Sequence, residues 1–146
     1  MTTIHRLLIA VLLAASGSQV YASNSFEGHF RVNGKDTTLA HLQVRAGSPY
    51  MRNATTMLVF TEKDAGADTG LDRHAPGGKW GTALLVTLWK DGDEYRVVGS
   101  QFADPGLKDR GASAIGVLNA SEVVVVGGRI SGKLVSRPDA QVFGDA

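Results

Sequence analysis

Four side chains that can bind a metal ion or transfer a proton lie close together in a glycine-rich stretch between residues 62 and 81, namely Asp64, Asp68, Asp72 and His74. Closely spaced aspartates and backbone carbonyls are suitable ligands for calcium. However, the common calcium loop places its acids at every second residue and ends in a glutamate, whereas these aspartates are four residues apart. The composition therefore favours a solvated loop of turn-forming residues. We therefore predict no bound metal. The residues that come closest to a set of metal ligands are Asp64, Asp68 and Asp72.

Three of the four histidines lie beyond residue 22, namely His29, His41 and His74. Three histidines are enough for a catalytic zinc site. The hairpin predicted below, however, places His29 and His41 on opposite faces of one ribbon, which argues against a shared metal. The sequence contains no Gly-x-Ser-x-Gly motif, and the glycines before Lys79 lack the spacing of a phosphate-binding loop. We therefore predict no cofactor and assign no catalytic residue.

Trp80 is the most distinctive side chain of the same stretch, because it lies among glycines and next to Lys79. Aromatic residues on loops are frequent binding anchors. Trp80, Lys79, His74 and Asp72 are accordingly the predicted ligand-binding residues. In the alternative interpretation, Trp80 folds back and caps the open end of the domain. For the Trp80 side chain the sequence favours this capping role over direct binding.

The rest of the chain must supply the scaffold, and its pattern is that of short strands separated by turns. The predicted strands cover residues 26–32, 36–45, 57–61, 82–90, 94–102, 114–118, 122–126 and 129–136. We expect no helix, and we expect residues 62–81 and 107–113 to be loops. Several short strands with turn signals between them predict an all-β domain, either an antiparallel β-sandwich, which we prefer, or a small β-barrel.

Two hairpins are predicted in detail. Asn33-Gly34 is typical of a two-residue turn, and it pairs Val32 with Lys35. In the second hairpin a turn at Asp91-Gly92 pairs Trp89 with Glu94 and directs Trp89 away from the core. The core face is then formed by Leu84, Val86, Leu88, Tyr95 and Val97. The four consecutive valines at 123–126 predict a strand that is buried on both faces.

The N-terminus has the pattern of an export signal. His5 and Arg6 precede an apolar run from Leu7 to Ala15, and small residues follow. The run is too short to span a bilayer, so we predict a signal peptide at residues 1–22, cleaved after Ala22. Residues 23–137 then form one domain and residues 138–146 a tail. The predicted location is periplasmic or secreted.

Composition narrows the function further. The chain has 146 residues, no cysteine and a formal net charge of +1, so it lacks thiol chemistry and a strong field for nucleic acid. The favoured function is a non-catalytic binding, inhibitor or immunity-type protein whose partner is a protein or a cell-envelope ligand. One alternative is an exported hydrolase or metal-dependent enzyme that uses residues 62–81. Another is a structural subunit of an envelope assembly.

Overall fold

The computed structural model describes residues 30–32, 35–106, 111–126 and 129–137. In this part of the chain the structure is mostly antiparallel β-strand with one short helix, which confirms the all-β prediction. The predicted signal peptide, the C-terminal tail and His29 lie outside the described residues.

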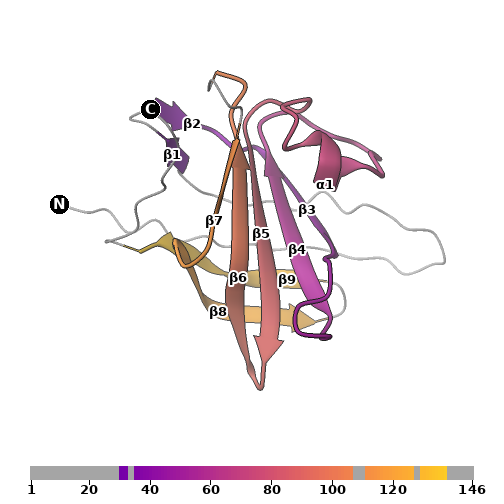
Figure 1. The fold of residues 1–146 in the computed structure, drawn as a ribbon, viewed down its shortest axis with the longest axis vertical. Helices are drawn as coiled ribbons and strands as arrows, with labels where there is room; N and C mark the ends of the chain where they lie inside the picture. Colours follow the sequence, from indigo (N-terminus) through magenta and orange to yellow (C-terminus); the bar gives the residue numbers. More distant parts are fainter. Residues whose placement is uncertain (1–29, 33–34, 107–110, 127–128, 138–146) are drawn as a thin grey trace.

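The main sheet has five antiparallel strands in the order β3-β4-β5-β6-β7 (Figure 1). They are β3 (His41–Ala46), β4 (Thr55–Thr61), β5 (Ala83–Asp91), β6 (Glu94–Ala103) and β7 (Gly111–Ala114). Each strand pairs with its neighbour in the chain, and β3 and β7 form the two edges. Among the described residues the sheet is therefore open, and its strands do not close into the barrel that was the alternative prediction.

A two-stranded ribbon packs on one face of the main sheet. It consists of β8 (Leu118–Val126) and β9 (Arg129–Ser136), which run across the direction of the main strands in Figure 1. The core between the two layers joins Leu58, Phe60 and Val86 of the sheet to Ile130 of β9. Burial of these apolar side chains is the main force that holds the layers together.

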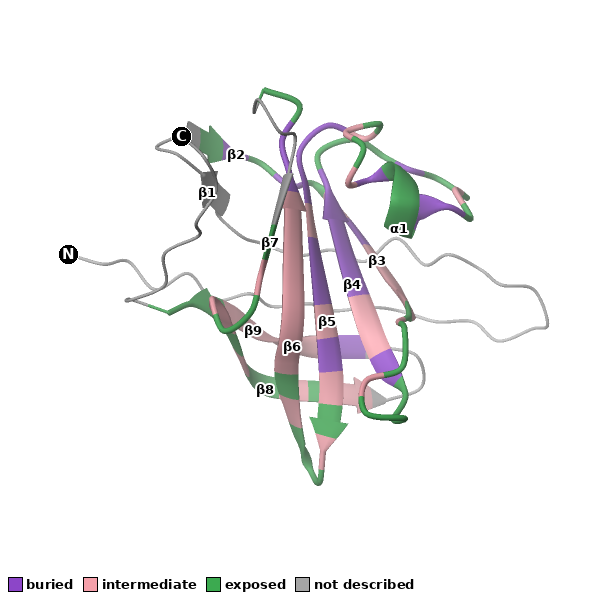
Figure 2. Cartoon of the chain, in the orientation of Figure 1, coloured by how far each residue is buried: buried purple, intermediate pink, exposed green. Residues whose placement is uncertain are grey.

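The segment between β4 and β5 covers the other face of the sheet, and this corrects the prediction of an unstructured connection. It contains the helical turn α1 (Leu71–His74), so the expectation of no helix is also wrong. Leu71 and Ala75 are fully buried and pack with Val59 and Leu85 of the sheet in a second apolar cluster. Figure 2 shows that this segment, which includes α1, contains buried as well as exposed stretches. We call residues 62–81 the cap loop.

The first hairpin is correct in its register and wrong in its length. In the β1 (Phe30–Val32) and β2 (Lys35–Thr37) pair, Val32 lies opposite Lys35, as predicted. The second strand ends at Thr37, however, and the chain enters the main sheet at His41. Leu39 and Leu42 are both buried, and this spacing of three breaks the period of two that one continuous strand requires. His41 lies in β3 opposite Thr61, so it belongs to the main sheet and not to the β1–β2 pair.

The second hairpin has the predicted core face but a different register. Asp91 pairs with Glu94, so the turn residues are Gly92 and Asp93, and Trp89 lies opposite Arg96 instead of Glu94. The shift of two residues preserves the alternation of faces. The predicted core-face residues accordingly contribute to the core between the layers, where the structure places Leu84, Val86, Leu88, Tyr95 and Val97.

The last strands differ from the prediction at three points. Residues 111–113, expected to be loop, belong to the edge strand β7 (Gly111–Ala114), whereas residues 115–117 of the predicted strand 114–118 form no strand. Asn119 to Ser121 belong to the continuous strand β8 and do not form a turn between two strands. Val123 and Val125 pack against the core, whereas Val124 between them is 53% exposed, so the valine run is not buried on both sides.

Candidate functional site

The cap loop begins and ends as an extension of the β4–β5 pair. The backbone N–H of Glu62 donates to the carbonyl oxygen of Thr82 at 2.9 Å, and that of Lys63 donates to the carbonyl of Trp80 at 3.0 Å. The Glu62 carboxylate also accepts the N–H of Thr82 at 2.9 Å. Gly81 lies beside this carboxylate with a φ of 77°, a conformation that favours glycine. Both ends of the cap loop are thus fixed to the sheet.

Asp68 is the centre of a hydrogen-bond network inside the cap loop. Its Oδ2 lies 2.8 Å from Nδ1 of His74 and accepts the indole N–H of Trp80, also at 2.8 Å. Its Oδ1 accepts the backbone N–H of Gly70 at 2.9 Å. The ammonium group of Lys79 is 3.8 Å from Oδ2. One carboxylate therefore positions three side chains that the sequence places six to twelve residues further along the chain.

This environment stabilises the ionised form of Asp68. The hydrogen bond from His74 is the largest of the effects that hold the pKa of the Asp68 carboxyl well below its ordinary value. Burial opposes this effect, while the Gly70 N–H and the Trp80 indole add to it. The Asp68 side chain is only 9% exposed, and Gly70, His74, Lys79 and Trp80, which contact its carboxylate, all belong to the cap loop.

Two side chains of β3 anchor the cap loop from the sheet. The Arg45 guanidinium donates to the carbonyl oxygen of Thr69 at 3.2 Å and to that of Asp68. The Gln43 amide donates to the carbonyl of Gly66 at 2.8 Å and accepts a bond from Arg45 at the same distance. A planar guanidinium can satisfy several acceptors at once, which explains why an arginine serves this position.

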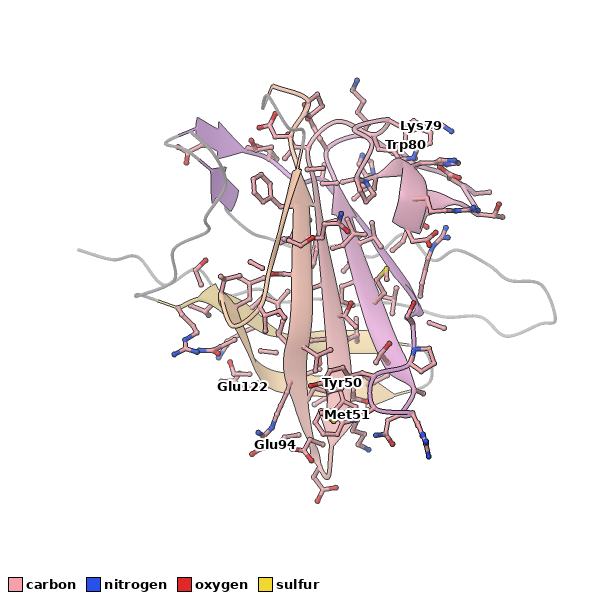
Figure 3. The ribbon with its side chains drawn as sticks, viewed as in Figure 1. Tyr50, Met51, Lys79, Trp80, Glu94 and Glu122 are labelled. Carbon is pink, nitrogen blue, oxygen red and sulfur yellow. The ribbon has the colours of Figure 1, made fainter. Side chains whose placement is uncertain are left out.

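The structure brings three of the four predicted ligand-binding residues together. The side chains of His74 and Lys79 are 45% and 53% exposed, while Trp80 packs on the buried cluster that includes Leu71. The Lys79 ammonium lies 4.9 Å from the centre of the Trp80 ring. Figure 3 shows Lys79 and Trp80 at one end of the main sheet. Trp80 therefore closes this end of the domain, while His74 and Lys79 face solvent.

Asp72, the fourth predicted residue, lies in the first turn of α1 and is exposed. Asp68 occupies the central position instead. The aspartates considered for calcium do not converge, because Asp64 accepts the backbone N–H of Gly66 at 2.8 Å while Asp68 is engaged with His74 and Trp80. Within the described ranges, no three histidine or acidic side chains form a group that could hold a metal ion.

Residue-type reasoning missed Gln43, Arg45 and Gly70 as parts of the site. A Cβ atom on Gly70 would meet Cε1 of the His74 ring at 2.7 Å, so the absence of a side chain gives the ring its place beside Asp68. Gln43 and Arg45 alternate with apolar residues along a strand, which marks a polar face. The alternation does not reveal that this face contacts a loop more than twenty residues away.

No known family model matches the sequence, and no curated protein or solved structure is significantly similar to it. Among the described residues, no helix is both long enough and apolar enough to cross a bilayer.

Proposed function

We propose that this chain is an exported binding protein, periplasmic or secreted, and that the end of the cap loop contacts a protein or cell-envelope ligand. The observation that carries the proposal is the Asp68 network. One shielded carboxylate fixes His74, Lys79 and Trp80, and it leaves His74 and Lys79 exposed to solvent.

A fixed surface of this kind suits binding, because side chains that are ordered in the free protein lose less conformational entropy when a ligand arrives. The cap loop is held at both ends by β4–β5 backbone bonds and in the middle by Arg45. The packing of the main sheet on the β8–β9 ribbon supports the preferred sandwich, a scaffold whose loops commonly bind ligands. The basic and apolar N-terminal sequence supports export.

A binding assay with envelope material tests the proposal. The purified protein is incubated with peptidoglycan sacculi and, separately, with solubilised envelope proteins, and the bound fraction is measured. The test variant is His74→Ala/Lys79→Met, and the control is Lys90→Met, since Lys90 is an exposed lysine in β5 outside the cap loop. We expect at least a tenfold weaker association for the test variant and no change for the control. Equal binding by all three proteins would refute the role of the cap loop.

The Asp68–His74 contact also favours a second candidate, an exported hydrolase. A carboxylate that accepts a hydrogen bond from Nδ1 orients an imidazole so that Nε2 can act as a general base. In this version Asp68 is the residue that orients His74. A panel of ester, glycoside and phosphodiester substrates tests it, because His74→Ala must abolish any turnover that depends on the pair.

A further inference from the structure

Tyr50 and Trp89 form an aromatic pair that belongs to neither of the apolar clusters of the described residues. The ring centroids are 5.4 Å apart and the ring planes are inclined at 56°, and both residues are half-buried. Trp89 follows Leu85 by four residues in β5, so both side chains lie on the sheet face that the cap loop partly covers. Figure 3 shows Tyr50 at the end of the main sheet opposite Lys79 and Trp80. The aromatic pair is therefore separate from the Asp68 network.

The connection between β3 and β4 holds Tyr50 against Trp89. Thr55 is the partner of Trp89 across the β4–β5 pair, and its hydroxyl donates to the carbonyl oxygen of Ser48 at 2.8 Å. Tyr50 and Asn53 exchange two backbone hydrogen bonds of 2.8 and 2.9 Å. The turn that carries the Tyr50 ring is thus ordered without a ligand, which reduces the entropy that binding would cost.

An exposed ion pair lies on the same face of the sheet. Arg96 in β6 is directly opposite Trp89, so their side chains project to the same side. The Nε atom of Arg96 is 3.1 Å from Oδ2 of Asp91, and the two side chains are 62% and 40% exposed. A guanidinium has five N–H donors and a carboxylate has about four acceptor sites, so this single contact leaves both groups able to bind further partners.

The sheet surface beside Trp89 is open. Gly99 in β6 lies opposite Thr87, which precedes Trp89 by two residues and therefore shares its face. Among the described residues, a Cβ atom on Gly99 would meet no atom beyond its chain neighbours within 4 Å. A ligand that packs on the rings is therefore not blocked by a side chain at this position.

The size of the aromatic pair favours a small ligand over a protein partner. Complete burial of a large aromatic side chain removes about 150–250 Å² of surface from solvent, and these two rings are already half-buried. Each partner in a stable protein interface buries about 800 Å². A pyranose sugar is a closer match, because its C–H face is about as large as one aromatic ring and its hydroxyl groups both donate and accept hydrogen bonds.

We propose that Tyr50, Trp89, Arg96 and Asp91 form a binding site for a neutral pyranose sugar within a glycan. The weakly positive C–H groups of the sugar pack on the negative faces of the rings, while its hydroxyls accept from Arg96 and donate to Asp91. β-Linked glucose and N-acetylglucosamine both present such a C–H face, because their ring substituents are equatorial. The inference goes beyond the proposed function, since it involves no residue of the cap loop.

An NMR titration of the full chain tests the proposal. The probes are the β-1,4-linked tetramers of glucose and of N-acetylglucosamine, added separately. The chain has two tryptophans, so two indole N–H signals report on the two ends of the sheet face, and Trp89→Phe assigns them. We expect a saturable shift of the Trp89 signal, no shift of the Trp80 signal, and an affinity that added salt does not change, because the sugars are uncharged. A response to one tetramer identifies the sugar, and a response to both identifies a site for equatorial pyranoses in general.

Calorimetry on variants identifies the contributing side chains. Tyr50→Leu and Trp89→Leu, which keep an apolar side chain without the ring, should each weaken binding at least tenfold. Trp89→Phe retains a ring and should stay within about threefold of the parent, since much of the stacking surface remains. Arg96→Met should weaken binding at least threefold. Lys90→Met is the control, because Lys90 is exposed and adjacent to Trp89 but points to the other face of β5.

Absence of saturable binding of either tetramer would overturn the sugar site, as would a shift of the Trp80 signal in place of the Trp89 signal. Full affinity in Tyr50→Leu would overturn it as well. The cap-loop variant His74→Ala/Lys79→Met should bind the sugars as the parent does. Failure of the sugar site would thus leave the proposed function of the cap loop intact, and the reverse also holds.

Discussion

The indole N–H of Trp80 donates to Oδ2 of Asp68, the same oxygen that lies 2.8 Å from the ring of His74. Trp80 is at the end of the cap loop and Asp68 near its middle, so this bond closes the loop on itself. Leu71, within the enclosed segment, is then buried against the sheet. The cap loop is thus a folded unit with a polar centre and an apolar underside, which is the property that a fixed binding surface needs.

Replacement of Asp68 by Asn is expected to lower stability near neutral pH, and the loss should shrink in acid. Because the folded-state pKa of Asp68 lies below the ordinary aspartate value of about 3.9, the native protein favours the ionised form. The resulting stabilisation is present above about pH 4 and disappears as the pH falls through that value towards the folded-state pKa. Urea unfolding between pH 2 and pH 7 should show the free energies of unfolding of the two proteins converging in acid.

Asp72→Asn is the matched control for this measurement, because Asp72 lies in the same loop and is exposed. Its unfolding free energy should follow that of the parent across the pH range. If Asp68→Asn instead keeps a constant deficit down to pH 2, ionised Asp68 is not the source of the stabilisation.

Gly70→Ala should separate His74 from Asp68 with a modest effect on folding. The added Cβ would lie 2.7 Å from Cε1 of the ring, and the ring is the mobile end of a side chain, so it can turn away. We expect a loss of about 1 kcal/mol, at the low end of overpacking effects. The His74 Nδ1 proton should lose its hydrogen-bonded NMR shift, and envelope binding should weaken. Gly99→Ala places its new methyl group where no atom beyond the neighbouring residues lies within 4 Å. It should change neither the NMR shift of the His74 Nδ1 proton nor envelope binding.

Arg45→Met is expected to loosen the middle of the cap loop while its ends stay in place. Hydrogen bonds to charged groups contribute about 1.5–3 kcal/mol, and the partial exposure of Arg45 favours the lower part of this range. Hydrogen exchange should accelerate at residues 66–70 and remain slow in β5. Arg96→Met removes an exposed arginine paired with Asp91 at 3.1 Å, and it should cost less than about 1 kcal/mol and leave the cap loop protected. Equal protection of residues 66–70 in both variants would contradict the anchoring role.

The strands that the sequence predicts well are those whose alternation is set by burial on one face. In β5 and β6, Val86, Leu88 and Val97 occupy the predicted core face even though the turn lies one residue later than expected. A glycine at either central turn position accommodates positive φ, so local rules cannot distinguish a turn at Asp91-Gly92 from one at Gly92-Asp93. Both turns leave each side chain on the same face of the sheet, because the two registers differ by two residues. The core residues are therefore predicted correctly, although the pairing register is not.

The candidate site was only half predictable for a different reason. The residue types of the cap loop identified His74, Lys79 and Trp80, but they could not identify Asp68 as their common partner. That choice depends on where burial of Leu71 places the helical turn. Arg45 lies more than twenty residues from the carbonyls that it binds, and no local pattern encodes such a contact. Long-range packing therefore determines which of the three cap-loop aspartates, Asp64, Asp68 or Asp72, lies at the centre of the site.

The turn at the opposite end of β4 offers a gain in stability. Met51 and Arg52 have φ values of 48° and 66°, and Tyr50 and Asn53 close the turn with two backbone bonds of 2.8 and 2.9 Å. Figure 3 shows Tyr50 and Met51 far from Lys79 and Trp80. The left-handed conformation costs an ordinary residue about 1–2 kcal/mol, whereas Asn-Gly is the favoured pair for turns with two positive φ angles.

The double substitution Met51→Asn/Arg52→Gly should therefore raise the free energy of unfolding by about 1–2 kcal/mol, measured by urea denaturation. Met51→Val should lower it, because a β-branched residue tolerates positive φ least. Met51 is 72% exposed, so its apolar side chain contributes little burial that the substitution could remove. Envelope binding should be unchanged in both variants, since the turn lies away from the cap loop. A loss of stability with Asn-Gly would show that contacts of Met51 or Arg52 outweigh the backbone strain.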